Sequence, residues 1–250
     1  MELEGAVCLV TGATSGIGRA TALRLAASAA RVLAFGRDPS ALQEVARLTS
    51  GVAVAVDLAE PAEVERAARE AQEAFGRVDV LVNNAGEGWA GRFDKQDAAA
   101  AERLVRVNLL APIRLTRALL PGMLERHTGR VVNVSSVAGH VGVRDETVYA
   151  STKAGLIGFS ESLRYELRGS GVAVSVVSPG VVRTPFFERR GASYARSFPR
   201  MIEPERVADA IIGAIQTGRA QVFVPRWLAF PVWLRGAWPG LYRALAGKYG

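Results

Sequence analysis

Three polar residues in the middle of the chain could together move a proton to or from a substrate oxygen. Tyr149 and Lys153 stand four residues apart in a stretch that predicts a helix, 148–168, so they would share one helix face. A free tyrosine has a pKa of about 10, and a nearby Lys⁺ would stabilise the phenolate and lower that pKa. Ser136, 13 residues before Tyr149, could hydrogen-bond the same oxygen.

Each of these residues also has a plain structural interpretation. A tyrosine and a lysine at this spacing often form a solvated pair on a helix surface, and a serine at a strand end often bonds local backbone. The neighbouring Ser135, 14 residues before the tyrosine, competes with Ser136. The chain has two histidines, His127 and His140, and one cysteine, Cys8. They are not spaced as metal ligands usually are, so we expect no metal site.

A glycine-rich segment near the start of the chain could bind a phosphate group. Residues 11–18 read Thr-Gly-Ala-Thr-Ser-Gly-Ile-Gly, between a strand candidate and a helix candidate. Glycines let the backbone turn tightly and approach a pyrophosphate closely, and the following helix N-terminus offers N–H groups. Three glycines in a loop are weak evidence alone, but their position between strand and helix strengthens the prediction.

The elements that would hold these residues alternate between short and long. Short valine-rich runs are apolar throughout, which is typical of strands buried on both faces of a parallel sheet. The strand candidates are 6–11, 31–36, 52–57, 78–82, 130–134, 172–177 and 221–224, and the helix candidates include 18–29, 39–48, 61–75 and 148–168. The pattern predicts an α/β fold, a Rossmann-type doubly wound parallel sheet of about seven strands with helices on both faces.

Length and composition restrict the class of protein. A chain of 250 residues without a linker or repeat is expected to form one domain, 1–250, with 226–250 as an aromatic tail. No apolar run reaches the roughly 18 residues of a membrane span, and Met1–Gly5 does not resemble a secretory signal. With one cysteine, these features favour the cytoplasm. The net charge is +7. Because no cluster of basic residues is interleaved with aromatic residues, we expect no nucleic-acid partner.

Further motifs follow the glycine loop in a fixed order. They are Asn83-Asn84-Ala85-Gly86, Asn108, Ser135-Ser136, Tyr149-x-x-x-Lys153 and Pro179-Gly180. With the loop spacing Gly-x-x-x-Gly-x-Gly, the sequence resembles the classical short-chain dehydrogenase/reductase (SDR) family from about Gly5 to Val224. The resemblance implies a nicotinamide-dependent oxidoreductase that moves a hydride on a carbonyl or alcohol, and an assembly such as a homodimer or homotetramer.

The resemblance also implies a role for each matching residue. The catalytic group would be Asn108, Ser136, Tyr149 and Lys153, with Asn108 supporting a water that relays protons to the lysine. The pyrophosphate of the cofactor would contact Gly12, Ser15, Gly16, Ile17 and Gly18, and the adenine would contact Asp57 and Leu58. Asn83 and Ala85 would lie beside the ribose of the adenosine. The nicotinamide carboxamide would contact Pro179, Gly180, Val182 and Thr184, and Tyr149 and Lys153 would also contact the cofactor. In one departure, Ala29 stands where the family has a turn glycine, which predicts strain of roughly 1–2 kcal/mol.

The choice of cofactor depends on the end of the second strand. Gly36 occupies the position where NAD-binding members carry an acidic residue, and Arg37 follows it. An arginine can pair with a 2′-phosphate, so we expect NADP(H), with NAD(H) as the alternative. Asp38 is counter-evidence, but it precedes Pro39 and is better interpreted as a helix N-cap.

The substrate and the tail are less defined. The substrate segment, 185–203, holds Phe186, Phe187, Tyr194, Phe198 and Met201, which favours a small apolar carbonyl or alcohol as substrate.

Three tryptophans and three arginines in 226–250 fit a tail packed over the cleft or against a second subunit, and peripheral membrane contact is the alternative. The rival to an enzyme is a dinucleotide-binding sensor without catalysis, which the intact set of four catalytic residues disfavours.

Overall fold

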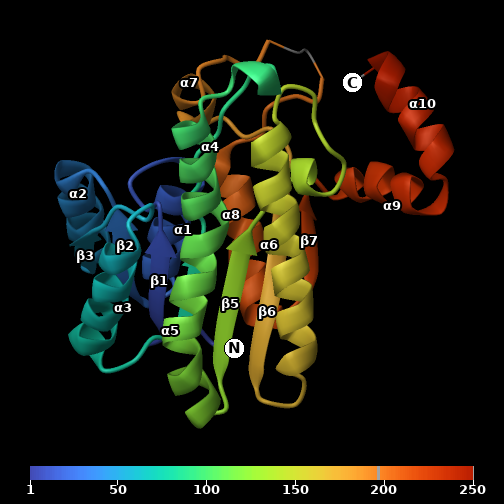
Figure 1. Ribbon diagram of the computed structural model, residues 1–250. Helices are drawn as coiled ribbons and strands as arrows, with labels where there is room; N and C mark the ends of the chain where they lie inside the picture. The colour runs from blue at the N-terminus through green and yellow to red at the C-terminus, as the bar shows by residue number, and fades with distance from the viewer. Residues whose placement is uncertain (196–197, 250) are drawn as a thin grey trace.

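Seven parallel strands form one sheet at the centre of the molecule. The computed structural model describes residues 1–195 and 198–249, and its strand order is β3-β2-β1-β4-β5-β6-β7 (Figure 1). The strands are β1 (Val7–Thr11), β2 (Arg31–Gly36), β3 (Val52–Ala55), β4 (Val80–Asn83), β5 (Gly129–Val134), β6 (Val172–Pro179) and β7 (Gln221–Val224). The chain reverses its direction of winding between β1 and β4, and in open parallel sheets such a reversal opens a ligand crevice at the carboxyl ends of the strands.

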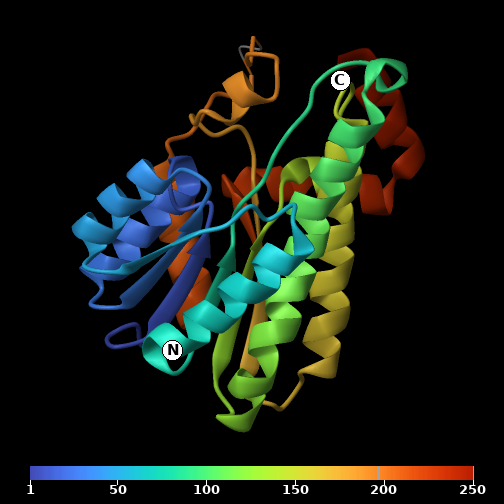
Figure 2. The same ribbon diagram turned by 60° about the vertical axis from the view of Figure 1, so that its left-hand side comes forward.

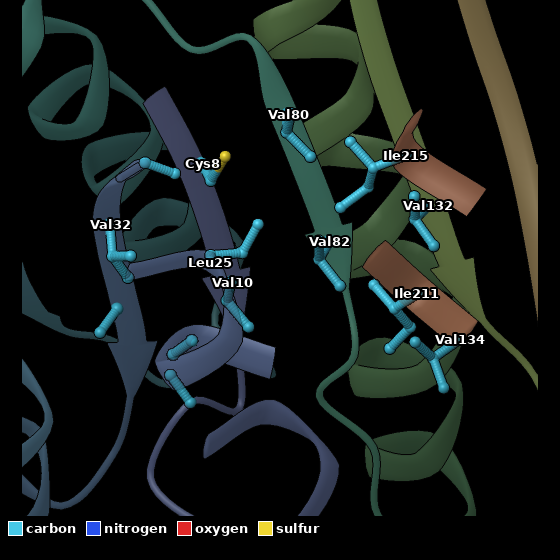
Figure 3. Packing of buried hydrophobic residues seen from close by; sticks show 14 of the residues in the cluster. Cys8, Val10, Leu25, Val32, Val80, Val82, Val132, Val134, Ile211 and Ile215 are labelled. Carbon is cyan, nitrogen blue, oxygen red and sulfur yellow. The ribbon is translucent and has the colours of Figure 1, made fainter. Parts of the chain in front are cut away.

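Helices pack on both faces of this sheet, as the sequence predicts. One face carries α1 (Gly16–Ala27), α2 (Pro39–Thr49) and α8 (Pro204–Thr217), and the other carries α3 (Pro61–Phe75), α5 (Ala111–Glu125) and α6 (Thr147–Glu166). Alternate residues of β1 point to opposite faces of the sheet. Cys8 and Val10 pack with Leu25 and Ile211 in one cluster (Figure 3), while Leu9 belongs to the other cluster. This alternation explains why the strands are apolar throughout.

The element boundaries lie close to the predicted ones. The second and seventh strands and the third helix begin and end at the expected residues, whereas β6 continues two residues further, through Ser178 and Pro179. Ala29 adopts φ 57° in the turn after α1, as the missing glycine implies. Asp38 caps α2, because its carboxylate accepts hydrogen bonds from the backbone N–H groups of Ser40 and Ala41.

The helical segment before β5 is interrupted. α4 (Ala98–Val105) and α5 are joined by a π-helical turn, Arg106–Leu110, which includes Asn108. A π-turn inserts one extra residue in a helix and often occurs at a functional site. Here it turns the Asn108 side chain into the interior, where that residue has no exposed surface.

The C-terminal tail leaves its tryptophans exposed, so the expected packing over the cleft is wrong for these side chains, whereas contact with a second subunit or with a membrane stays a prediction. The tail forms two short helices, α9 (Ala229–Ala237) and α10 (Pro239–Tyr249), which extend away from the α/β body (Figures 1 and 2). Trp227, Trp233 and Trp238 are 46%, 56% and 55% exposed. Pro239 begins the second helix, which keeps the tail from forming one continuous helix. No helix among the described residues is long and apolar enough to cross a membrane.

Candidate active site

A cleft of about 850 Å³ opens at the carboxyl ends of the strands. It is lined by the glycine loop, the end of β2, the segment after β4, the serines after β5, the start of α6 and the segment that contains α7 (Phe186–Arg189). The expected site residues that line it are Gly12, Ser15, Gly16, Ile17, Arg37, Asp57, Leu58, Ala85, Ser136, Tyr149, Lys153, Pro179, Gly180, Val182 and Thr184. The expected residues that lie behind its wall are Gly18, Asn83 and Asn108.

The glycine loop is shaped so that side chains are excluded at its tightest points. A Cβ at Gly18 would lie 2.1 Å from the Gly12 carbonyl oxygen, and Gly12 itself has φ 65° beside the Ala85 backbone. Ser15 precedes α1 without a side-chain cap bond, and the first helical residues, Gly16 and Ile17, line the cleft, so the uncapped start of the helix lies beside it. The loop therefore fits the pyrophosphate of a dinucleotide, which needs close backbone approach and a helix N-terminus.

Asn83 is held inside the sheet and away from the cleft. Its side chain is buried and donates a hydrogen bond of 2.8 Å to the Oδ1 atom of Asn133. The next residue, Asn84, lines the cleft and donates to the carbonyl oxygen of Thr11 at 2.9 Å. Asn84 thus ties the segment after β4 to the end of β1, beside the glycine loop.

The two neighbouring serines after β5 have different partners. The Ser135 hydroxyl donates to the backbone carbonyl of Lys153 at 3.0 Å, so it fastens this segment to α6. The Ser136 hydroxyl accepts a hydrogen bond of 3.1 Å from the Ala138 N–H and faces the cleft. Only Ser136 also interacts with the phenol of Tyr149. The geometry therefore favours Ser136, as the sequence spacing predicts.

Lys153 lies at the floor of the cleft, one helical turn after Tyr149. The lysine is 4% exposed, and its Nζ atom donates to the Val134 carbonyl oxygen at 3.0 Å. Nζ lies 5.8 Å from the centroid of the Tyr149 ring. Burial lowers the pKa of Lys153 from 10.5 to about 8, so the ammonium form still predominates at neutral pH.

The pKa of Tyr149 does not move in the expected direction. Burial raises the pKa of this phenol well above its ordinary value, and hydrogen bonding with Ser136 offsets only part of the increase. The expected lowering by Lys153 is not seen, since the ammonium is directed at the Val134 carbonyl. Tyr149 is consequently a neutral phenol across the physiological range and carries the proton that a donor needs.

Asn108 supports the floor of the site from behind. Its Oδ1 atom accepts from the N–H of Glu87 at 2.9 Å, and its Nδ2 atom donates to the Glu87 carbonyl at 2.9 Å and to the Thr152 hydroxyl at 3.2 Å. A Cβ added at Gly86 would lie 3.4 Å from both Asn108 Oδ1 and Lys153 Nζ, so these two groups share one small space.

Charged residues form a network at the other end of the cleft. Arg37 pairs with Glu87 at 2.7 Å, and Arg103 bonds both Glu87 and Asp57, the latter through two hydrogen bonds of 3.0 and 3.1 Å. Burial would raise the pKa of Asp57, but hydrogen bonds from Arg103 and Ala59 bring it below its ordinary value. Sequence reasoning missed Glu87 and Arg103, because no local pattern links Arg103 to a carboxylate 46 residues away.

This arrangement agrees with comparisons to known proteins. The sequence model of a family described as short chain dehydrogenase matches residues 6–195. This chain belongs to that family. It is therefore an NAD(P)-dependent short-chain dehydrogenase/reductase, an oxidoreductase with the Rossmann-like sheet described above.

Three similar proteins illustrate the family. A ketoacyl reductase, HetN, from Nostoc sp. is 37% identical and matches 89% of this chain and 79% of its own length. A solved SDR from Burkholderia phymatum in complex with NAD has a TM-score of 0.86 and 27% identity, with 95% of each chain covered. A metagenomic short-chain oxidoreductase in complex with NADP has a TM-score of 0.76 and 37% identity, covering 89% of this chain and 98% of that one.

The remaining wall of this short-chain dehydrogenase combines aromatic rings with a buried ion pair. Phe186 lies against Tyr149 with ring centroids 5.4 Å apart, and Phe187 packs against Tyr194 at 5.5 Å. Arg190 pairs with Glu146 through a short contact, and both side chains are nearly buried. Aromatic rings thus line this part of the cleft beside a paired arginine and glutamate, and Arg144, Asp145 and Arg189 line it as well.

Proposed function

We propose that this protein is an NADP(H)-dependent reductase that converts a carbonyl on an apolar substrate to an alcohol, or runs the reverse oxidation. The observation that carries the proposal is the meeting of Tyr149, Ser136 and Lys153 in one cleft with Asn108 directly behind them. The bound nicotinamide would supply the hydride, and the protein would supply orientation and proton transfer.

The protein's own residues would handle the substrate oxygen. Tyr149, which is a neutral phenol, donates its proton to the oxygen as negative charge develops there. The Ser136 hydroxyl hydrogen-bonds the same oxygen and stabilises that charge. The Lys153 ammonium donates to the Val134 carbonyl while Tyr149 is neutral, and it would stabilise the phenolate once Tyr149 has given up its proton. Asn108 holds the backbone beside the lysine in position.

Arg37 supports the choice of NADP(H). It lines the cleft at the end of β2, where Gly36 leaves no carboxylate to accept from a ribose hydroxyl. A 2′-phosphate would compete with Glu87 for this guanidinium and would form the stronger, doubly charged pair. The residues present therefore fit the phosphorylated cofactor, and the metagenomic relative in complex with NADP is consistent with this choice.

The rings around the substrate end support an apolar substrate. Phe186, Phe187 and Tyr194 line the cleft beside Tyr149, and Arg190 is already paired with Glu146. The Nostoc relative is a ketoacyl reductase, so a carbonyl on an acyl chain is the first substrate class to test. Such a chain would lie along the aromatic wall with its ketone near Ser136.

The decisive experiment replaces Tyr149 with phenylalanine. Tyr149→Phe keeps the ring and removes the acid, so turnover with β-ketoacyl thioesters and aryl ketones should fall by roughly 10²- to 10⁴-fold. NADPH binding, measured by fluorescence titration, should persist. Tyr165→Phe is the matched control, because Tyr165 lies on the same helix but is 69% exposed. Unchanged turnover in Tyr149→Phe would refute the mechanism, and a wild type that binds cofactor yet reduces no carbonyl would favour the sensor alternative.

A further inference from the structure

The C-terminal tail exposes several large apolar side chains. They are between 43% and 62% exposed, and we call them the tail surface: Trp227, Phe230, Trp233, Trp238, Leu241 and Leu245. α9 buries none of its side chains completely. Surfaces of this kind on a folded protein mark a contact with a partner.

Ring contacts link three members of the tail surface. The Phe230 and Trp233 rings lie 6.1 Å apart, and Trp233 meets Trp238 edge-on at 5.5 Å across the break between the two helices. Leu241 and Leu245 stand one helical turn apart on α10, which begins directly after Trp238. The two short helices lie at an angle to one another (Figure 1).

The charge of this region points to the chemistry of the partner. From residue 210 to the end, the sequence has no Asp or Glu and has four arginines and one lysine. Arg226, Arg235 and Arg243 are exposed among the aromatic residues. Tryptophan beside arginine, with no acidic residue, is typical of segments that lie in the interface of an anionic bilayer, with rings at headgroup depth.

A second copy of the chain fits this surface less well. In a twofold contact the same patch meets itself, so two segments that carry only positive charge would face one another. An anionic lipid surface instead attracts each of these cations. No described helix is both long enough and apolar enough to cross a bilayer.

The position of the tail connects this surface to the substrate end of the cleft. Trp227 stacks on Phe198 of the substrate segment with ring centroids 5.4 Å apart. Leu228 is buried against Gly180, which lines the cleft, and Arg235 bonds the carbonyl of His140. Figure 1 shows both tail helices toward the end of the molecule where the strands terminate.

We propose that the tail surface docks this protein on an anionic lipid bilayer as a peripheral membrane contact. The rings of Trp233 and Trp238 enter the headgroup region, and Arg226 and Arg243 pair with lipid phosphates. Docking places the substrate segment next to the bilayer. The docking does not depend on the proposed reaction, because it rests on residues outside the catalytic group.

Vesicle co-sedimentation of the full-length protein tests this contact. We expect binding to vesicles of phosphatidylglycerol and phosphatidylcholine, little binding to pure phosphatidylcholine, and release by added salt. Trp233→Ser combined with Trp238→Ser should abolish binding. Arg226→Gln combined with Arg243→Gln should weaken it by about fivefold for each cation. Tyr165→Ser and Arg168→Gln, an exposed aromatic and an exposed cation on the opposite end of the molecule, should bind as the wild type does.

Two further measurements make the outcome unambiguous. Circular dichroism and turnover with a water-soluble ketone should be the same in the tail variants and the wild type, which separates docking from folding and from catalysis. Brominated lipids should quench the tryptophan fluorescence of the wild type. The proposal is overturned if the wild type does not bind anionic vesicles, or if the double tryptophan variant binds them as well as the wild type does. It is also overturned if the wild type forms a dimer in sedimentation velocity that the double tryptophan variant loses. That result would assign the tail surface to contact with a second copy of the chain.

Discussion

The backbone of Glu87 holds the side-chain amide of Asn108 from both sides. The Glu87 N–H donates to Asn108 Oδ1 and the Glu87 carbonyl accepts from Asn108 Nδ2, both at 2.9 Å. The carboxylate of the same residue bonds Arg37 and Arg103 at the other end of the cleft. One residue therefore joins the floor of the catalytic group to the cations that we assign to the cofactor phosphate.

The paired amide contacts predict the effect of Asn108→Asp. The variant keeps the size of the side chain and one acceptor, but it leaves the Glu87 carbonyl without its donor and places a carboxylate in a fully buried position. We expect turnover to fall by at least about tenfold and the free energy of unfolding to fall by about 1–3 kcal/mol. Urea denaturation and steady-state kinetics measure both effects. Thr152→Val removes the third Asn108 contact, together with the bond from the Thr152 hydroxyl to the Tyr149 carbonyl, and leaves both Glu87 contacts intact, so it should show a smaller loss in each measurement.

Arg37→Ala should lower the affinity for NADPH while affinity for NADH changes little, because only NADPH carries the 2′-phosphate. The loss should correspond to a charge-assisted hydrogen bond, about 1.5–3 kcal/mol or roughly 10- to 100-fold in dissociation constant. Isothermal titration with each cofactor gives the ratio. A wild type that prefers NADH, with the same ratio in Arg37→Ala, would contradict the assignment.

Glu87→Gln should have the opposite effect on cofactor affinity. It removes the carboxylate that competes for Arg37 but keeps the backbone contacts with Asn108. The Arg37 pair is half exposed, and such pairs contribute about 0.2–1 kcal/mol, so NADPH should bind about two- to fivefold more tightly. Glu44→Gln, which breaks an exposed pair with Arg19 on neighbouring helices, is the control and should leave affinity unchanged.

The pH dependence of carbonyl reduction should follow Lys153. Its pKa is lowered to about 8, so the ammonium is present below that pH and is lost as the pH rises through it. Stabilisation of the phenolate disappears with the charge, and kcat/KM should therefore decline above about pH 8. Burial also lowers the pKa of His140, which keeps this histidine from titrating in the same range. Lys153→Arg should lose the decline, since arginine stays charged; an identical decline in that variant would point to another group.

Ala29→Gly should stabilise the protein. Ala29 has φ 57°, which costs an alanine roughly 1–2 kcal/mol and costs glycine nothing. The greater entropy of glycine in the unfolded chain removes about 0.4–1 kcal/mol of that gain, which leaves a net increase of roughly 0.5–1 kcal/mol. Ala26→Gly, three residues earlier within α1, should instead destabilise by about 0.5–1 kcal/mol. Chemical denaturation of the two variants tests both signs.

The sequence alone determined the parallel sheet and its helices, and it was enough to propose the catalytic group. These features follow from local patterns: valine-rich runs, a glycine loop at a helix start, and a tyrosine and lysine one turn apart on α6. The preference for Ser136 over Ser135 came from the spacing that the resemblance to the family implies, and in the structure the Ser135 hydroxyl is bonded to the Lys153 carbonyl.

Only the tertiary structure decided what each of these groups contacts. Glu87 and Arg103 form their network across loops and helices distant in sequence, and Asn83 is turned into the sheet by its bond to Asn133. The Tyr149 pKa rises because burial depends on the packing of the whole site, which a spacing of four residues does not encode. The exposure of Trp233 likewise depends on where two short helices leave the body, since the same aromatic residues suit a buried tail or a docking surface.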